Sequence, residues 1–158
     1  TAGLAYAGSP EPMLYDPAPM LPGEVPAHLG DVEIMQLAED LRGTFKTHVA
    51  YVKRRGQVVP PPSGHSDAVP HLQGVDAAPL AAHVAQTGQV IVDLAEEEFH
   101  LDLPCDAAGL IGAIDGRRSL ADIQTKARLD PQAFAALWAS VEEALCGVGM
   151  MHYSRLLA

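Results

Sequence analysis

Residues 106–155 read DAAGLIGAIDGRRSLADIQTKARLDPQAFAALWASVEEALCGVGMMHYSR and predict three short helices followed by a strand. The helices are expected over Asp106–Asp115, Ser119–Arg128 and Pro131–Leu145, and the strand over Met150–Arg155. In the third helix the apolar side chains recur at helical spacing and form one stripe, which consists of Phe134, Leu137, Trp138, Val141 and Leu145. Burying such side chains stabilises the fold by about 1.5–3 kcal/mol each, which makes this helix the anchor of the predicted core.

Local signals mark where these helices begin and end. Asp115-Gly116 is a turn signal after the first helix, and Ser119 is expected to cap the second, with Asp122 as its capping-box partner. Asp130 and Pro131 predict the start of the third helix. Aspartate accepts hydrogen bonds at an N-cap, and proline at the first helical position lacks only an N–H that would be unpaired anyway.

This order of elements is the outline of a winged helix. In a winged helix that reads DNA, the third helix enters the major groove and carries basic and amide side chains. Here residues 131–147 contain no Lys, Arg or His, but they contain Glu142 and Glu143. The shape suggests nucleic-acid binding, and the charge opposes it.

The first part of the chain is predicted to hold an arm, two helices and a strand. Residues 1–30 form an extended Pro-rich arm that is expected to be irregular, because proline supplies no N–H to ladders or helix interiors. Residues 31–88 form a helix–strand–loop region, with helices over 31–42 and 77–86. The spacing of apolar residues switches to two over Thr44–Lys53 and predicts a strand, onto which Val58-Val59 pairs back. Residues 60–70 are predicted to be a loop.

Residues 89–158 are predicted to be the winged-helix-like module. A hairpin joins Val90–Leu94 to Phe99–Leu103 through a turn at Glu96–Glu98 and leads into the three helices. With this hairpin the expected fold class is α+β: a winged-helix-like three-helix module with small antiparallel strands, preceded by the Pro-rich arm.

Composition excludes some classes of function. The 158 residues are 48% apolar, enough to bury a core, and contain no run near the roughly 20 apolar residues that span a bilayer. The net charge is −10, and the one basic cluster, Lys53-Arg54-Arg55, is interpreted as a solvated strand end. Polyanion binding requires concentrated positive charge, which this chain lacks.

Two cysteines, Cys105 and Cys146, form neither a zinc motif nor a disulfide scaffold. We expect both to be reduced thiols packed as small hydrophobic groups, in a cytoplasmic protein. The chain begins at Thr1 without a signal peptide, and we expect it to be a piece of a longer protein.

The segment Ala113–Ile123 reads AIDGRRSLADI. It resembles the first residues of small helix-turn-helix modules at the C-terminus of bacterial class I S-adenosylmethionine-dependent methyltransferases. A similar sequence pattern occurs in PqqD-like peptide-binding domains. Residues 38–54 resemble the segment that follows the catalytic domain in such methyltransferases, and residues 149–155 are compatible with the closing strand. The resemblance implies an accessory or regulatory role beside a methyltransferase domain, without methyl transfer by these residues.

Several polar residues could ligate a metal ion, but they do not have the sequence spacing of a metal-binding motif. His65, Asp67 and His71 carry groups that ligate zinc or iron, but no third histidine accompanies them, and we interpret them as a polar loop. Residues 96–102 are rich in acids but lack the spacing of a calcium loop, and we interpret them as a solvated hairpin tip. The other histidines considered are interpreted as surface or half-buried residues: His28, His48, His83 and His152.

Two further patterns fail as catalytic or cofactor sites. Residues 63–67 contain the letters of a hydrolase triad, but adjacent positions cannot align a nucleophile, a base and an orienting group. Gly109, Gly112 and Gly116 lie within and after a helix rather than in a nucleotide-binding turn, and we interpret them as small residues that permit close packing. We therefore assign no catalytic, cofactor-binding or metal-binding residue.

We predict a non-catalytic accessory or regulatory domain of a methyltransferase-like protein. It is expected to contact its own catalytic domain or a protein or peptide partner, with no membrane partner, and DNA is disfavoured by charge. Three alternatives stay open: a DNA-binding transcriptional regulator, a PqqD-like peptide-binding module that uses an exposed strand edge, and a small metalloprotein that uses His65 and His71.

Overall fold

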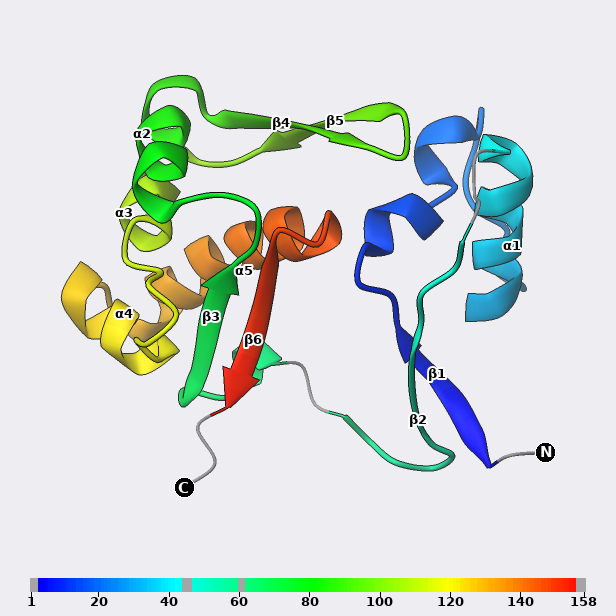
Figure 1. Ribbon diagram of the computed structural model, residues 1–158, viewed down its shortest axis with the longest axis horizontal. Helices are drawn as coiled ribbons and strands as arrows, with labels where there is room; N and C mark the ends of the chain where they lie inside the picture. Colours follow the sequence, from blue (N-terminus) through cyan, green and yellow to red (C-terminus); the bar gives the residue numbers. More distant parts are fainter. Residues whose placement is uncertain (1–2, 44–46, 60–61, 156–158) are drawn as a thin grey trace.

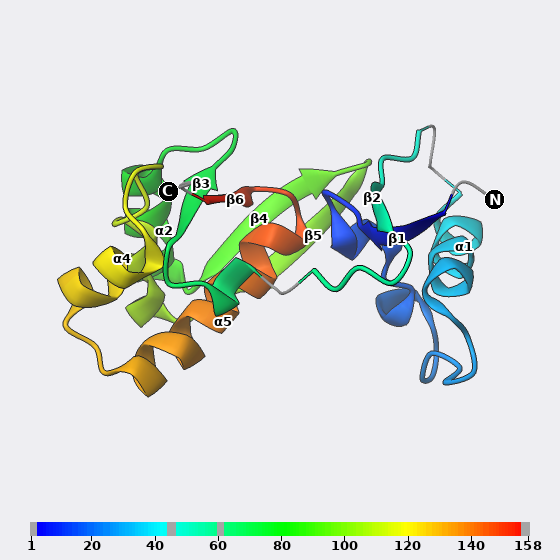
Figure 2. The same cartoon turned by 90° about the horizontal axis from the view of Figure 1, so that it is seen from below.

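The computed structural model describes residues 3–43, 47–59 and 62–155, which form two lobes side by side (Figure 1). The first lobe contains β1 (Leu4–Gly8), 3-10 helices at Pro12–Tyr15 and Ala18–Met20, α1 (Asp31–Arg42) and β2 (Tyr51–Arg54). The second contains β3 (Ala68–Leu72), α2 (Ala77–Thr87), β4 (Gln89–Leu94), β5 (Glu97–Asp102), α3 (Ala108–Ile111), α4 (Leu120–Ala127), α5 (Pro131–Gly147) and β6 (Met151–Arg155). Two more 3-10 helices lie at Pro62–Gly64 and Cys105–Ala107. Figure 2 shows α1 at one end of the molecule and α4 at the other.

The strands form two-stranded antiparallel sheets. The pairs in the described chain are β1–β2, β3–β6 and β4–β5. Together with the helices, these small sheets confirm the predicted α+β class. The division into residues 1–30, 31–88 and 89–158 stays a prediction.

The second lobe is held together by one cluster of buried apolar side chains, to which β3, α2, the β4–β5 hairpin, α3, α4, α5 and β6 all contribute. From α5, Phe134, Trp138, Val141 and Leu145 are buried, as the stripe predicts. Leu137 is only half-buried and is the exception. It lies at the margin of the stripe and faces a groove described below.

The predicted helix caps are confirmed. The Ser119 hydroxyl accepts a hydrogen bond from the Asp122 N–H (3.2 Å), and the Asp122 carboxylate accepts one from the Ser119 N–H (3.0 Å). Asp130 caps α5 by accepting from the N–H groups of Gln132 and Ala133, both at 3.0 Å. The first predicted helix is shorter than Asp106–Asp115, because α3 ends at Ile111. Two glycines lower the helix propensity of this segment.

The hairpin turn is two residues long rather than the predicted Glu96–Glu98. Ala95 and Glu96 both have positive φ angles, 52° and 70°, which is the backbone of a tight hairpin turn. Leu94 therefore pairs with Glu97, and β5 begins at Glu97. This register places Glu97 on the strand and lets it reach the first lobe.

The prediction for β1 and β2 was wrong in two respects. Part of the arm, expected to be irregular, forms β1, which pairs with β2 through Leu4↔Arg54 and Tyr6↔Val52. The strand expected from Thr44 begins only at Tyr51; residues 44–46 lie outside the described chain, and Val58-Val59 lie outside the strand. Pairing between residues about fifty positions apart leaves no local signal in the sequence.

The predicted loop over residues 60–70 contains the start of β3, and Pro60-Pro61 lie outside the described chain. Pro70 is inside this strand, opposite Tyr153 of β6. Gln73 donates its N–H to the Met150 carbonyl at 2.9 Å, so the paired hydrogen bonds fall at positions 71 and 73 rather than at 70. A proline is tolerated there because its missing N–H faces away from β6.

The arm docks the first lobe onto the second at two glycines. Gly147, at the end of α5, leaves room for Met13, and Gly149 leaves room for the carbonyl of Pro10. Leu14 and Tyr15 are buried in the same part of the arm. The arm therefore packs on the folded body, where the absence of two side chains makes space for it.

We expect Gly147→Val to displace this arm. A Cβ at position 147 would lie 2.6 Å from Met13 Cε and 2.9 Å from Met13 Cγ, while the backbone there is not left-handed. The clash should lower the free energy of unfolding by about 1–3 kcal/mol, measured by urea denaturation. Adding Met13→Ala should restore most of this loss. A double variant no more stable than the single one would contradict the contact.

Candidate functional site

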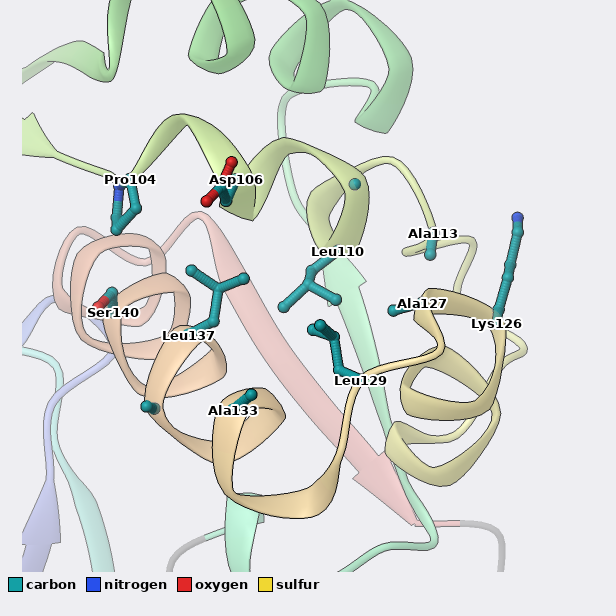
Figure 3. Close-up of a pocket in the computed structure, with 12 residues that line it drawn as sticks. Pro104, Asp106, Leu110, Ala113, Lys126, Ala127, Leu129, Ala133, Leu137 and Ser140 are labelled. Carbon is teal, nitrogen blue, oxygen red and sulfur yellow. The ribbon is translucent and has the colours of Figure 1, made fainter.

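An apolar groove of about 730 Å³ lies between α3, α4 and α5 (Figure 3). We call it the α3–α5 groove. Its lining residues are Pro104, Asp106, Gly109, Leu110, Ala113, Lys126, Ala127, Leu129, Ala133, Ala136, Leu137 and Ser140.

The groove exists because the exposed side of α5 next to the core carries small residues. Ala133, Ala136 and Ser140 follow one another at helical spacing, and only Leu137 among the α5 lining residues is large. Leu110 of α3 is buried and forms the floor. In Figure 3 the leucine side chains of three different segments converge on this hollow.

The polar groups of the groove lie at its margins. Asp106 precedes α3 and Lys126 belongs to the last turn of α4; both are exposed, and Figure 3 shows them at different ends of the groove. Ser140 adds a hydroxyl on α5. Such a surface can bury two or three apolar side chains and meet charged groups that flank them.

The loop between α3 and α4 is rigidly built. The Asp115 carboxylate accepts hydrogen bonds from the N–H groups of Arg117 (3.0 Å) and Arg118 (2.9 Å), and it pairs with the Arg118 guanidinium at 3.1 Å. These backbone hydrogen bonds, together with the two arginine charges, lower the pKa of Asp115. The turn that the sequence predicts is therefore held by its own aspartate.

The predicted polar-loop residues are dispersed. Asp67 accepts a hydrogen bond from Arg155 at 3.3 Å, and His71 Nε2 lies 2.7 Å from the Ser154 hydroxyl. Within the residues that the structure describes, no three His, Cys, Asp or Glu side chains gather as they would around a metal ion.

The acidic hairpin residues have separate partners. Glu98 lies 2.7 Å from His100 Nε2, and Asp102 accepts a hydrogen bond from the Gln89 side chain at 2.9 Å. Glu97 forms an ion pair with Arg42 of α1.

The glycine series is spread over α3 and the turn after it. Gly109 belongs to α3, and a Cβ on Gly112 would lie 3.4 Å from Ala81 of α2, so α2 and α3 approach closely there. Both cysteines are free thiols. The prediction that both are packed was wrong for Cys105, which is exposed, whereas Cys146 is half-buried.

Sequence reasoning missed a hydrogen-bonded chain between the arm and α1. The Tyr15 hydroxyl lies 3.2 Å from His48 Nδ1, and His48 Nε2 lies 3.2 Å from the Glu39 carboxylate. Burial raises the pKa of Tyr15, as do the nearby carboxylates of Glu11 and Glu39, so the phenol stays protonated at neutral pH. The hydrogen bonds from Tyr15 through His48 to Glu39 therefore connect the arm to α1, and they do not supply a phenolate. No local pattern signals it.

Comparison with known proteins found no match to a protein-family model, a curated protein or a solved structure. Among the described residues, no helix has both the length and the apolar character needed to cross a membrane.

Proposed function

We propose that this chain is a non-catalytic accessory or regulatory domain of a methyltransferase-like protein. In this proposal the α3–α5 groove contacts the catalytic domain of that protein or another protein partner. The observation that carries the proposal is the groove itself, an apolar hollow of about 730 Å³ that the described chain leaves open to solvent. Exposed apolar surface of this kind is typical of protein-contact sites.

The order of elements supports a winged-helix-like module over residues 89–158. The β4–β5 hairpin leads into α3, α4 and α5, and β6, which pairs with β3 (Ala68–Leu72), follows α5. The segment Ala113–Ile123 forms a tight turn followed by the capping box of α4. A turn followed by a capped helix is expected at the start of a helix-turn-helix module.

The groove also indicates the chemistry of its partner. Leu110, Leu129 and Leu137 offer apolar contacts, while Asp106 and Lys126 offer one charge of each sign at the margins. A helical segment with apolar side chains on one face and charged residues at its ends fits this pattern.

Charge continues to oppose DNA as the partner. In α5 the charged residues are Glu142 and Glu143. Of the cations in α4 and its flanking turns, Arg118 is paired with Asp115. Phosphate binding needs positive charge that is not already neutralised.

The proposal is tested with Leu137→Asp and the matched control Ala139→Asp. Both positions lie on α5, but only Leu137 lines the groove. Affinity is measured by calorimetry between this domain and the catalytic domain of the same gene product, each expressed separately. Leu137→Asp should weaken binding by about a hundredfold, because a carboxylate would be buried without a partner, and Ala139→Asp should leave it unchanged.

Two results would contradict the proposal. One is a gene product without a methyltransferase-type catalytic domain. The other is micromolar binding of labelled S-adenosylmethionine by this chain alone, which would make it a cofactor-binding unit in its own right.

A further inference from the structure

The exposed apolar side chains of this chain are concentrated in the first lobe. Of the nine large apolar side chains that are exposed among the described residues, eight lie between positions 4 and 59, and the ninth is Ile91. Two of the eight, Leu4 (48% exposed) and Val52 (59% exposed), belong to the ribbon that β1 and β2 form. Apolar surface that gathers in one region of a folded protein is typical of a contact site.

The register of this ribbon places its exposed apolar side chains beside a cation. Leu4 is directly opposite Arg54, and Tyr6 is directly opposite Val52. Because side chains two residues apart on a strand point to the same side, all four share one face. Tyr6 is half-buried and the other three are exposed. We call the surface formed by Leu4, Val52 and Arg54 the ribbon face.

The ribbon face is positively charged on a chain whose net charge is −10. The stretches that contain the ribbon, residues 1–10 and 41–66, hold none of the 20 Asp and Glu residues and five of the 10 Lys and Arg residues. Asp31 of α1 contributes to the raised pKa of Tyr6, after burial and Tyr15. Arg54 and the adjacent Arg55 nevertheless form no ion pair within the described chain. Their charge is available to a partner.

The outer face of the β4–β5 hairpin has the complementary composition. Ile91, which is 54% exposed, lies in the middle of this face, and the alternate residues Val90 and Leu101 are buried on the other side. The outer face contains three acids and no Lys or Arg. We call it the hairpin face, and its side chains, all exposed, are those of Gln89, Ile91, Asp93, Glu98, His100 and Asp102.

Two acids of the hairpin face are placed against each other. Asp93 is directly opposite Glu98, and like charges in this position destabilise an antiparallel pair. Glu98 lies 2.7 Å from His100 Nε2, but Asp93 forms no ion pair within the described chain. A cation bound between the two carboxylates would relieve their repulsion. The hairpin face therefore favours a positively charged partner.

The two faces do not meet within one chain. In Figure 1 the hairpin runs along the upper side of the molecule, whereas the ribbon lies on the lower side of the first lobe. A second copy of this chain carries both complementary surfaces: an apolar face with a cation, and an apolar side chain between acids. Charge complementarity therefore selects a second copy as the partner.

We propose that copies of this chain bind one another, with the ribbon face of one copy on the hairpin face of the next. Arg54 reaches Asp93 and Glu98 of the other copy, while Leu4 and Val52 cover Ile91. The contact joins sheet faces and leaves the strand edges unused. It is separate from the α3–α5 groove and goes beyond the function proposed above. Because the two surfaces differ, the copies form a reciprocal pair, a ring or a filament.

The test is sedimentation velocity of the chain at concentrations up to about 500 µM, because a contact between two small patches is weak. We expect self-association that decreases as NaCl is added, since salt screens exposed charges. Arg54→Glu and Asp93→Lys should each weaken it at least about tenfold. The matched controls Arg128→Glu and Glu24→Lys make the same changes of charge at exposed positions outside both faces, and they should leave it unchanged.

The two charge reversals should compensate each other. An equimolar mixture of the Arg54→Glu and Asp93→Lys proteins should associate again, because every ribbon face then finds a hairpin face of opposite charge. Asp93→Lys should not lower the free energy of unfolding measured with urea, because it replaces a repulsion of Glu98 by an attraction. Its loss of association is therefore distinguishable from unfolding.

Four outcomes would overturn the inference. The chain could stay monomeric at about 500 µM in low salt, the reversals and their controls could have equal effects, or the mixture could associate no more than its components. The fourth outcome is association that Leu137→Asp removes and Arg54→Glu leaves intact, which would place the contact in the α3–α5 groove. Binding of the catalytic domain is measured separately, so the proposed function stands or falls independently.

Discussion

Glu97→Ala is expected to lower the free energy of unfolding by about 3 kcal/mol, the largest effect we predict for an exposed or half-exposed position. Glu97 forms an ion pair with Arg42, whose side chain is only 2% exposed, whereas that of Glu97 is 38% exposed. Burial lowers the pKa of Arg42, which shows that its charge is poorly solvated there. Removing the carboxylate leaves that charge with only the more weakly acting Asp16 carboxylate, which raises the pKa of Arg42 less than burial lowers it.

The other contacts of Arg42 cannot replace the carboxylate. Its Nη2 donates to the carbonyls of Met13 (3.5 Å) and Asp16 (3.4 Å), and its guanidinium lies 5.4 Å from the centre of the Phe99 ring. Nε has no acceptor among the described residues. Carbonyls and a ring carry no net charge, and the Asp16 carboxylate offsets the effect of burial on the pKa of Arg42 only in part, so together they compensate the buried cation incompletely.

The measurement is urea denaturation of Glu97→Ala beside Glu98→Ala. Glu98 is on the opposite face of β5 and lies 2.7 Å from His100 in an exposed pair, so its loss should cost no more than about 0.5 kcal/mol. The double variant Arg42→Met with Glu97→Gln should recover most of the stability, because it removes both charges together. Equal costs for the two single variants would show that Arg42 does not depend on Glu97.

Trp138→Ala is expected to lower the free energy of unfolding by about 3–5 kcal/mol. Trp138 is 2% exposed and stacks on Phe134, with ring centres 5.7 Å apart and planes at 15°. Its indole N–H donates to the Tyr153 hydroxyl at 2.9 Å and so joins α5 to β6. Truncation leaves a cavity in the core and removes the indole N–H that donates to that hydroxyl.

Two further variants separate these contributions. Tyr153→Phe removes the hydroxyl and keeps the ring, so it should cost about 1 kcal/mol. Ala139→Ser, at an exposed position beside Trp138, should change stability by less than about 0.5 kcal/mol. A loss below about 1 kcal/mol for Trp138→Ala would mean that the core does not depend on α5 as the packing indicates.

The candidate site was accessible to sequence reasoning only in part. The helices around the α3–α5 groove were predicted, because their caps and their apolar spacing depend on residues that lie close together in the sequence. The groove was not predicted, because alanine and serine at positions 133, 136 and 140 look like ordinary exposed helix residues. They become a hollow only when α3 and α4 pack beside them.

The sequence by itself determined the elements whose signals are local: the capping box of α4, the Asp130-Pro131 start of α5, α2, and the presence of the β4–β5 hairpin. Only the tertiary structure decided the β1–β2 and β3–β6 pairings, the docking of the arm and the burial of Arg42. Caps and spacing act between neighbours along the chain, whereas strand partners, a buried charge and a groove depend on residues that meet only after the chain has folded.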